Sequence, residues 1–229
     1  MKRLVVPELL DSDSGTPREV EDSLADLRMF NRRFGGVRAM AALLHEVAER
    51  SGLKSIDWLD VAGGAGDVAT LTRELLGRRG LAVRPTVMDR APTHLNGVNL
   101  NVCGDALALP FCSGSFDVVG SSLFAHHLEP EELTQFAAEG LRVARYAFVI
   151  NDLIRHPLHL ALALAGRPIF RSRITRHDAP ASVRRAYTVD EIGRILQGTG
   201  AAQISIRTFY LYRLGVIVWK TREPQPIMT

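Results

Sequence analysis

A glycine-rich turn in the first third of the chain carries the residues best suited to holding a ligand. It reads Asp60-Val61-Ala62-Gly63-Gly64-Ala65-Gly66-Asp67 and separates an apolar run from a segment of helical periodicity. Glycines let a strand-to-helix turn approach a ligand closely, and the free amides of a helix start attract polar or negative groups. Asp89 ends the next apolar run, where a carboxylate can accept two hydrogen bonds from ribose hydroxyls. The pattern predicts a nucleotide site.

Two adjacent histidines supply candidates for proton transfer. His126 and His127 follow the fourth apolar run, and Asp152 follows the fifth. In open α/β folds ligands bind at the carboxyl ends of the strands, so these side chains are expected to lie near the glycine turn. A histidine there can accept a proton from a hydroxyl group, although one of the pair could instead cap the helix that begins at Pro130. Three well-spaced metal ligands are not evident, so no metal is expected.

Short apolar runs and helical stretches alternate through the middle of the chain. The runs lie at residues 56–61, 83–88, 100–102, 116–119 and 147–150, with helical periodicity at 67–78 and 130–144. This alternation predicts a parallel sheet covered by helices on both faces. Residues 202–212 and 214–220 follow one another too closely for a parallel return and are expected to pair antiparallel. The expected fold is a Rossmann-like, doubly wound, mostly parallel α/β sheet of seven strands with an antiparallel C-terminal hairpin.

The N-terminal part is expected to be a disordered leader and a helical cap over residues 1–50. Residues 11–23 are polar and turn-rich, which predicts a mobile leader without function. Helical periodicity over residues 24–50 is broken by Gly35-Gly36 into two helices. Residues 51–229 then form the ligand-binding domain, with an insertion at about 151–187 that could fold over the ligand as a lid. After the insertion, Thr188 and Glu191 form a capping-box pattern that predicts a helix start.

Composition limits the class of protein. The chain has 229 residues, of which 46% are apolar and 23% charged, which is the profile of a compact soluble domain. Two cysteines are too few for a disulfide framework, and no signal peptide is recognised, so a cytoplasmic protein is expected. The longest apolar run, residues 157–166, is too short to cross a bilayer, although it could lie on one.

The glycine turn alone fits two kinds of nucleotide. Gly64-x-Gly66-x-x-Ala69 matches the dinucleotide pattern of NAD(P)-dependent oxidoreductases. The spacing D-x-A-G-G-A-G from Asp60 resembles the S-adenosylmethionine (AdoMet) loop of class I methyltransferases, with Ala62 in place of the first glycine. The later blocks GDALALPF, from Gly104, and GSFDVV, from Gly114, are similar to a second motif of that family. The segment LDVAGGAGDVA, residues 59–69, resembles the corresponding segment of the ubiquinone and menaquinone biosynthesis methyltransferases and of related small-molecule methyltransferases.

The resemblance implies a role for each matching residue. Gly64 and Gly66 would pass close to the methionine and ribose parts of AdoMet, and Asp89 would hold the ribose hydroxyls. Arg90, Asp105 and the Ala106 amide would surround the adenine, and Ser121 would lie beneath the sulfonium. His126 resembles the catalytic histidine of plant phenolic O-methyltransferases. The implied cofactor set is Asp60, Ala62, Gly63, Gly64, Gly66, Asp89, Arg90, Asp105, Ala106 and Ser121.

The acceptor is expected to be small and hydrophobic. Apolar residues of the N-terminal helices and of the insertion would line its pocket, and polar groups would orient it; the candidates are Phe30, Phe34, Asp152, His156 and His159. We expect O-methylation of a phenolic or polyketide-like hydroxyl in secondary metabolism, with His126 or His127 as general base. C-methylation of a quinone-type ring, an oxidoreductase and a catalytically silent AdoMet-binding module remain open. No nucleic-acid partner is expected. A peripheral membrane contact is possible, and the sequence is compatible with a monomer or a homodimer.

Overall fold

The sheet at the centre of the molecule has seven strands in the order β3-β2-β1-β4-β5-β7-β6. The computed structural model describes residues 1–12, 14–92, 95 and 100–220. The strands are β1 (Ser55–Val61), β2 (Ala82–Asp89), β3 (Leu100–Cys103), β4 (Phe116–Ser122), β5 (Ala144–Leu153), β6 (Gln203–Phe209) and β7 (Arg213–Trp219). The first five run parallel, whereas β7 is antiparallel to both β5 and β6. The predicted fold class is therefore confirmed.

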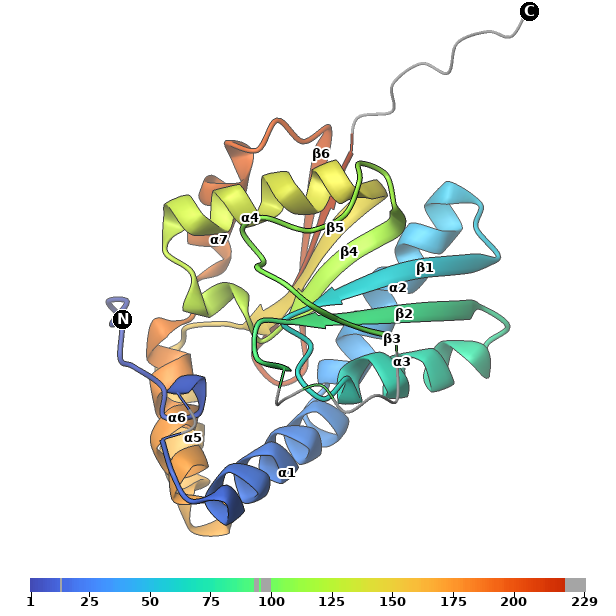
Figure 1. The fold of residues 1–229 in the computed structure, drawn as a ribbon. Coiled ribbons are helices and arrows are strands. Elements are labelled where there is room, and N and C mark those ends of the chain that lie inside the picture. Colours follow the sequence, from blue (N-terminus) through green and yellow to red (C-terminus); the bar gives the residue numbers. More distant parts are fainter. Residues whose placement is uncertain (13, 93–94, 96–99, 221–229) are drawn as a thin grey trace, which may run out of the picture.

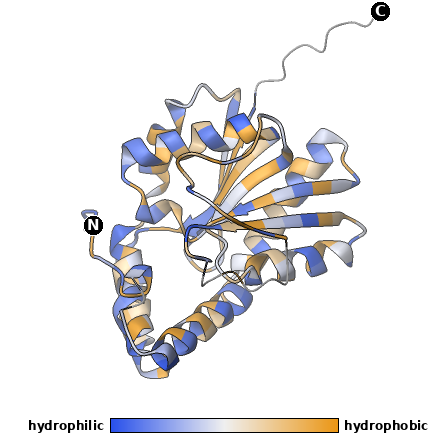
Figure 2. Cartoon of the chain, in the orientation of Figure 1, coloured by the Kyte–Doolittle hydropathy of each residue, from blue (hydrophilic) through white to orange (hydrophobic). Residues whose placement is uncertain are grey.

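Helices cover both faces of this sheet (Figure 1). On one face α2 (Gly36–Ser51) and α3 (Asp67–Gly77) pack in a core with Trp58 and Val118. On the other, α4 (Pro130–Val143) and α7 (Val189–Gln197) pack in a core with Phe136 and Phe148. Burial on both faces accounts for the near-continuous apolar runs of the central strands, which Figure 2 shows in orange.

Three more helices form a cap beyond the carboxyl ends of the strands (Figure 1). They are α1 (Pro17–Arg33), α5 (Pro157–Ala165) and α6 (Arg173–Arg185), accompanied by the short 3₁₀ turns η1 (Leu10–Ser12) and η4 (Arg167–Ile169). The insertion expected at 151–187 forms α5 and α6, except that β5 continues to Leu153. None of the helices in the described ranges is long and apolar enough to cross a membrane.

The mobile leader expected over residues 11–23 is a wrong prediction for its second half. Helix α1 begins at Pro17, not at Leu24, because Thr16 and Glu19 form a reciprocal capping box and Pro17 occupies the first turn. The break between the two N-terminal helices lies where it was expected, since Gly35 has φ +85° and is the N-cap residue of α2. The first twelve residues run along α6, and we refer to residues 1–12 as the strap (Figure 1).

Candidate functional site

A cavity of about 480 Å³ lies between the sheet and the cap. Its floor is the glycine turn after β1, contributed by Asp60, Ala62, Gly63 and Gly64. One wall is the 3₁₀ turn η3 (Ala125–His127), and the others come from α1, α5, α6 and the strap. Arg28 of α1 ties the cap to this floor through an ion pair of 2.9 Å with Asp67, the first residue of α3.

Backbone hydrogen bonds, one to β2 and one within the turn, hold the turn in place. Gly63 N–H donates to Met88 O at 3.1 Å, and Gly66 N–H donates back to Gly63 O at 2.9 Å. A Cβ on Gly63 would stand 2.8 Å from Val87 Cγ1 and 3.0 Å from Asp60 Oδ2, so no larger residue fits there. Beside Gly64, in contrast, a Cβ would meet open space. The turn therefore packs closely against the sheet and leaves its other side free for a ligand.

Two carboxylates lie beside this turn. Asp89 Oδ2 accepts a 2.9 Å hydrogen bond from Gly64 N–H. Asp60 is fully buried, and neither of its carboxylate oxygens has a hydrogen-bond partner within the described part of the chain. Burial, and then the nearby negative charge of Asp89, raise the pKa of Asp60 to about 8. A cation or hydrogen-bond donor bound here would relieve the desolvation of Asp60.

The remaining cofactor candidates lie outside the lining of the cavity. Arg90 and Asp105 are exposed beyond the carboxyl ends of β2 and β3, whereas Ala106 is buried. Asp105 Oδ1 accepts from Leu107 N–H at 2.9 Å, which fixes its carboxylate. None of these three lines the cavity. Ser122, not the predicted Ser121, contributes to the lining, because successive side chains of β4 point to opposite faces of the sheet.

His126 is buried at the base of the wall and is held by Asp152. His126 Nδ1 lies 2.6 Å from Asp152 Oδ1, and the His126 backbone N–H donates to Asp152 Oδ2 at 3.0 Å. Asp152 itself lies behind the ring and does not line the cavity. Its carboxylate also accepts from Leu153 N–H, so three hydrogen bonds fix its orientation. This arrangement leaves Nε2 on the side of the ring away from Asp152, and His126 belongs to the lining of the cavity.

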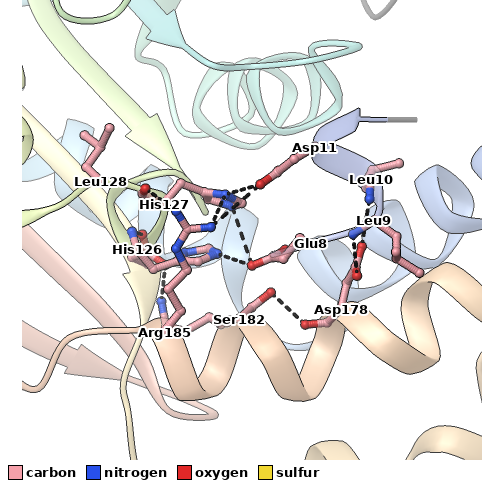
Figure 3. Close-up of polar contacts among 12 residues, drawn as sticks. Glu8, Leu9, Leu10, Asp11, His126, His127, Leu128, Asp178, Ser182 and Arg185 are labelled. Atoms are coloured by element: carbon pink, nitrogen blue, oxygen red, sulfur yellow. Dashed lines mark hydrogen bonds and ion pairs between the residues drawn. The ribbon is translucent and has the colours of Figure 1, made fainter. Parts of the chain in front are cut away.

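The strap brings an unpredicted carboxylate to the same histidine (Figure 3). Glu8 Oε1 lies 3.5 Å from His126 Nε2 and 3.9 Å from His127 Nε2, and Asp11 Oδ2 lies 3.1 Å from His127 Nδ1. Burial alone would lower the pKa of His126, but the charges and hydrogen bonds of Asp152 and Glu8 outweigh it and raise that pKa to about 10. Burial alone would raise the pKa of Glu8, but His126 holds it below its usual value. At neutral pH the cluster carries an imidazolium between two carboxylates.

The strap is anchored along its whole length. Leu9 N–H and Leu10 N–H donate to the two carboxylate oxygens of Asp178, at 2.9 and 3.0 Å. Arg3 forms an ion pair of 2.9 Å with Glu129 and donates to the backbone carbonyls of Leu128 and Arg185. No local sequence pattern could have indicated Glu8, because its partners lie more than a hundred residues further along the chain.

Aromatic side chains form the apolar end of the cavity. Phe30 and Phe34, two of the candidates for the acceptor pocket, line the cavity, and Phe170 meets the ring of Phe30 edge to face at 5.3 Å. His159 also lines it, and its Nδ1 lies 3.0 Å from Ile154 O. His156 does not line the cavity: it caps α5 by accepting from Leu158 N–H and stacks on Tyr212.

Arg213 is a second lining residue that the sequence did not indicate. It lies at the start of β7 with only 3% of its surface exposed, and its Nη2 donates to Asn31 Oδ1 at 2.9 Å. Burial lowers its pKa to about 10, so it remains a cation at neutral pH. Its other terminal nitrogen, Nη1, has no hydrogen-bond partner among the residues that the structure describes. The cavity lining therefore includes a buried cation.

The segment that contains the glycine turn and the two histidines is similar to a known protein family. Residues 59–146 match the model of a methyltransferase domain family. This segment is a methyltransferase domain, and the chain has the fold of the class I AdoMet-dependent methyltransferases. The matched segment of the methyltransferase runs from β1 into β5 and includes Asp60, Asp89, Asp105 and both histidines of η3. The match does not separate the ubiquinone and menaquinone group from other methyltransferases of this class, and it gives no support to an oxidoreductase.

Solved structures share the fold of this methyltransferase at low sequence identity. The plantazolicin methyltransferase BpumL, in complex with S-adenosylhomocysteine, has a TM-score of 0.68 at 14% identity, covering 94% of this chain and 95% of that one. A SAM-dependent methyltransferase from Aquifex aeolicus has a TM-score of 0.55 at 19% identity, covering 77% and 89%. The CMeT domain of the citrinin polyketide synthase has a TM-score of 0.57 at 12% identity, covering 82% and 52%. No curated protein matches the sequence.

The residues around the turn fit the cofactor of this class. The buried oxygens of Asp60 lack partners among the described residues, and the open side of Gly64 leaves room for a ligand beside Asp89. AdoMet is the cofactor of the methyltransferase and supplies an electrophilic methyl group. A cationic ligand suits this floor, because its charge would favour the ionised form of Asp60 and lies close to the carboxylate of Asp89.

Proposed function

We propose that the methyltransferase transfers the methyl group to the hydroxyl oxygen of a small hydrophobic acceptor, a phenol or an enol. The observation that carries this proposal is the shape of the cavity, which joins the glycine turn, the Nε2 edge of His126 and the aromatic wall in one space. A flat apolar ring would lie against Phe30, Phe34 and Phe170. Its hydroxyl would then reach the polar end of the cavity, between the turn and η3.

The proposed role of the protein is to position the oxygen and to hold its proton. Methyl transfer is an in-line displacement, so most of the rate comes from fixing the acceptor atom about 3 to 3.5 Å from the methyl carbon with water excluded. In the reacting state the acceptor oxygen is an anion and His126 Nε2 carries the proton, while Asp152 holds Nδ1–H and keeps the ring in place. A neutral acceptor beside a neutral His126 and an anionic acceptor beside the His126 imidazolium contain the same number of protons. Both pairs therefore lead to this reacting state.

Arg213 is proposed to hold a second oxygen of the acceptor. Its Nη1 lies in the lining without a partner among the described residues, and a buried donor left unpaired costs about 1 to 3 kcal/mol. A carbonyl or a second hydroxyl on the ring would satisfy it. The favoured acceptors are therefore rings with two oxygen substituents and an apolar remainder, as in polyketide-like phenols.

Incubation with methyl-labelled AdoMet and a panel of alkyl-substituted phenols and resorcinols tests this proposal. We expect label in the ether methyl of the product, located by mass spectrometry and proton NMR. His126→Gln should reduce turnover by about 10²- to 10⁴-fold while AdoMet binding persists in a thermal shift assay. The matched control is His45→Gln, an exposed histidine on α2. Label on a ring carbon would show C-methylation and overturn the proposed O-methylation. Full turnover in both His126→Gln and His127→Gln would show that neither histidine takes part in the reaction.

A further inference from the structure

Three potential metal ligands meet at one point of the cavity wall (Figure 3). They are Glu8 of the strap and His126 and His127 of η3, and one ligand atom of each lies within 4.8 Å of the other two. The carboxylate oxygen Glu8 Oε1 lies between the two rings, 3.5 Å from His126 Nε2 and 3.9 Å from His127 Nε2. The sequence did not indicate this cluster, since Glu8 is far from the histidines in the chain.

Each ring is oriented by a carboxylate on its opposite side. Asp152 Oδ1 lies 2.6 Å from His126 Nδ1, and Asp11 Oδ2 lies 3.1 Å from His127 Nδ1. A metal-binding histidine usually donates its other ring N–H to such a partner, which fixes the tautomer and leaves the lone pair on the ligating nitrogen. In this cluster both rings turn Nε2, not Nδ1, toward Glu8.

Two of the three ligand atoms are buried without a satisfied hydrogen bond. Glu8 Oε1 and His126 Nε2 have no partner of hydrogen-bond geometry in the described residues, and the side chain of His126 is only 3% exposed. Unpaired buried polar atoms are rare in proteins and commonly indicate a missing water or ion. An ion bound between these atoms would satisfy both.

The donor set selects among metal ions. Two imidazoles and one carboxylate are a typical protein ligand set for Zn²⁺, with a fourth position left open, whereas Mg²⁺ and Ca²⁺ prefer oxygen ligands. Metal–ligand distances of about 2.0 to 2.2 Å require ligand atoms roughly 3.3 Å apart, so the pair of Glu8 and His126 is already close to that spacing. The fourth position faces the cavity, because all three residues belong to its lining.

From this geometry we infer that Glu8, His126 and His127 bind one Zn²⁺ ion and that the bound ion inhibits the methyltransferase. The inhibitory part depends on the function proposed above, in which His126 Nε2 accepts the proton of the acceptor. Zn²⁺ occupies the same lone pair, so the histidine no longer accepts a proton. The ion also fills the polar end of the cavity, where the hydroxyl would lie.

Calorimetric titration with Zn²⁺ measures the site without reference to turnover. Tag-free protein carrying Cys103→Ser and Cys112→Ser should be used, because both thiols are exposed and a thiolate is itself a good zinc ligand. We expect one saturable site, and the d–d absorption of Co²⁺ should report nitrogen and oxygen coordination. Glu8→Gln and His127→Gln should each weaken Zn²⁺ binding by at least about tenfold.

His45→Gln is the matched control for this titration. His45 Nδ1 lies 3.3 Å from Glu49 on the exposed side of α2, so the control removes a histidine beside a glutamate without altering the cavity. Its Zn²⁺ affinity should equal that of the cysteine-free parent. Equal affinity in Glu8→Gln and His127→Gln, or no saturable binding in the parent, would overturn the zinc site and leave a simple ion pair between Glu8 and His126.

A separate measurement distinguishes failure of the site from failure of the proposed function. Methyl transfer should fall over the same Zn²⁺ concentrations that saturate the calorimetric site and should recover on addition of a chelator. Zinc binding at Glu8 together with unchanged methyl transfer would overturn the inhibition and with it the proposed role of His126. If the parent shows no saturable Zn²⁺ binding in calorimetry, the metal site is overturned and the proposed function is unaffected.

Discussion

At the residue scale, Ala62 occupies a conformation that suits glycine. Its φ of +54° lies in the left-handed region, which costs a residue with a Cβ about 1 to 2 kcal/mol. We expect Ala62→Gly to raise the free energy of unfolding by about 1 kcal/mol, measured by urea denaturation. Ala42→Gly, in the interior of α2, is the control and should lower it by about 0.5 to 1 kcal/mol. A destabilised Ala62→Gly protein would mean that the alanine methyl makes a packing contact that outweighs the backbone cost.

Asp152 acts on the reaction through His126. Its carboxylate holds Nδ1 at 2.6 Å and is itself fixed by two backbone amides. Asp152→Asn keeps the size of the side chain but removes the charge that favours Nδ1–H, so we expect kcat to fall at least tenfold while the Kd for AdoMet changes little. Single-turnover kinetics and AdoMet titration measure the two separately. A parallel loss of AdoMet binding would instead point to a structural role for Asp152.

At the scale of elements, the strap depends on one carboxylate of α6. Asp178 accepts hydrogen bonds from Leu9 N–H and Leu10 N–H, and bonds to a charged acceptor contribute about 1.5 to 3 kcal/mol each. Asp178→Asn removes the charge and one acceptor oxygen, so amide exchange of the strap should become at least tenfold faster in hydrogen–deuterium exchange mass spectrometry. Asp190→Asn, in the first turn of α7, is the control. Unchanged exchange in the strap would show that Arg3 and its carbonyl partners anchor it alone.

The elements of the sheet and the cap differ in how well local sequence determines them. The capping box that begins α7 at Thr188 is predicted from the sequence and is confirmed. The same signal is present at Thr16 and Glu19, but the polar composition of residues 11–23 favoured a mobile leader, and α1 begins there instead. In α1 only one side contacts the rest of the protein, so its many polar residues were a poor guide to its structure, whereas its capping residues were a good one.

At the scale of the whole molecule, Asp60 makes stability depend on pH. With a pKa of about 8, folded Asp60 keeps its proton at pH 5 to 6, whereas an unfolded aspartate releases it near pH 4. The unfolded state therefore binds fewer protons, and the free energy of unfolding falls by up to about 1.4 kcal/mol per pH unit as pH rises. The difference between the parent and Asp60→Asn in urea denaturation at pH 5 and pH 6 should show this slope. An equal slope in both proteins would mean that Asp60 is ionised in the fold.

The sequence by itself determined the sheet, its C-terminal hairpin and the cofactor class, because these depend on signals that lie close together in the chain. Apolar runs alternating with helices indicate strands buried on both faces, and the turn from Asp60 to Asp67 carries its glycines within eight residues. Only the tertiary structure brought Glu8 to His126, turned Arg213 into the cavity and placed Ser122, not Ser121, in the lining. Those contacts join segments far apart in the chain, and they depend on how the cap and the strap pack against the carboxyl edge of the sheet, which no local pattern specifies.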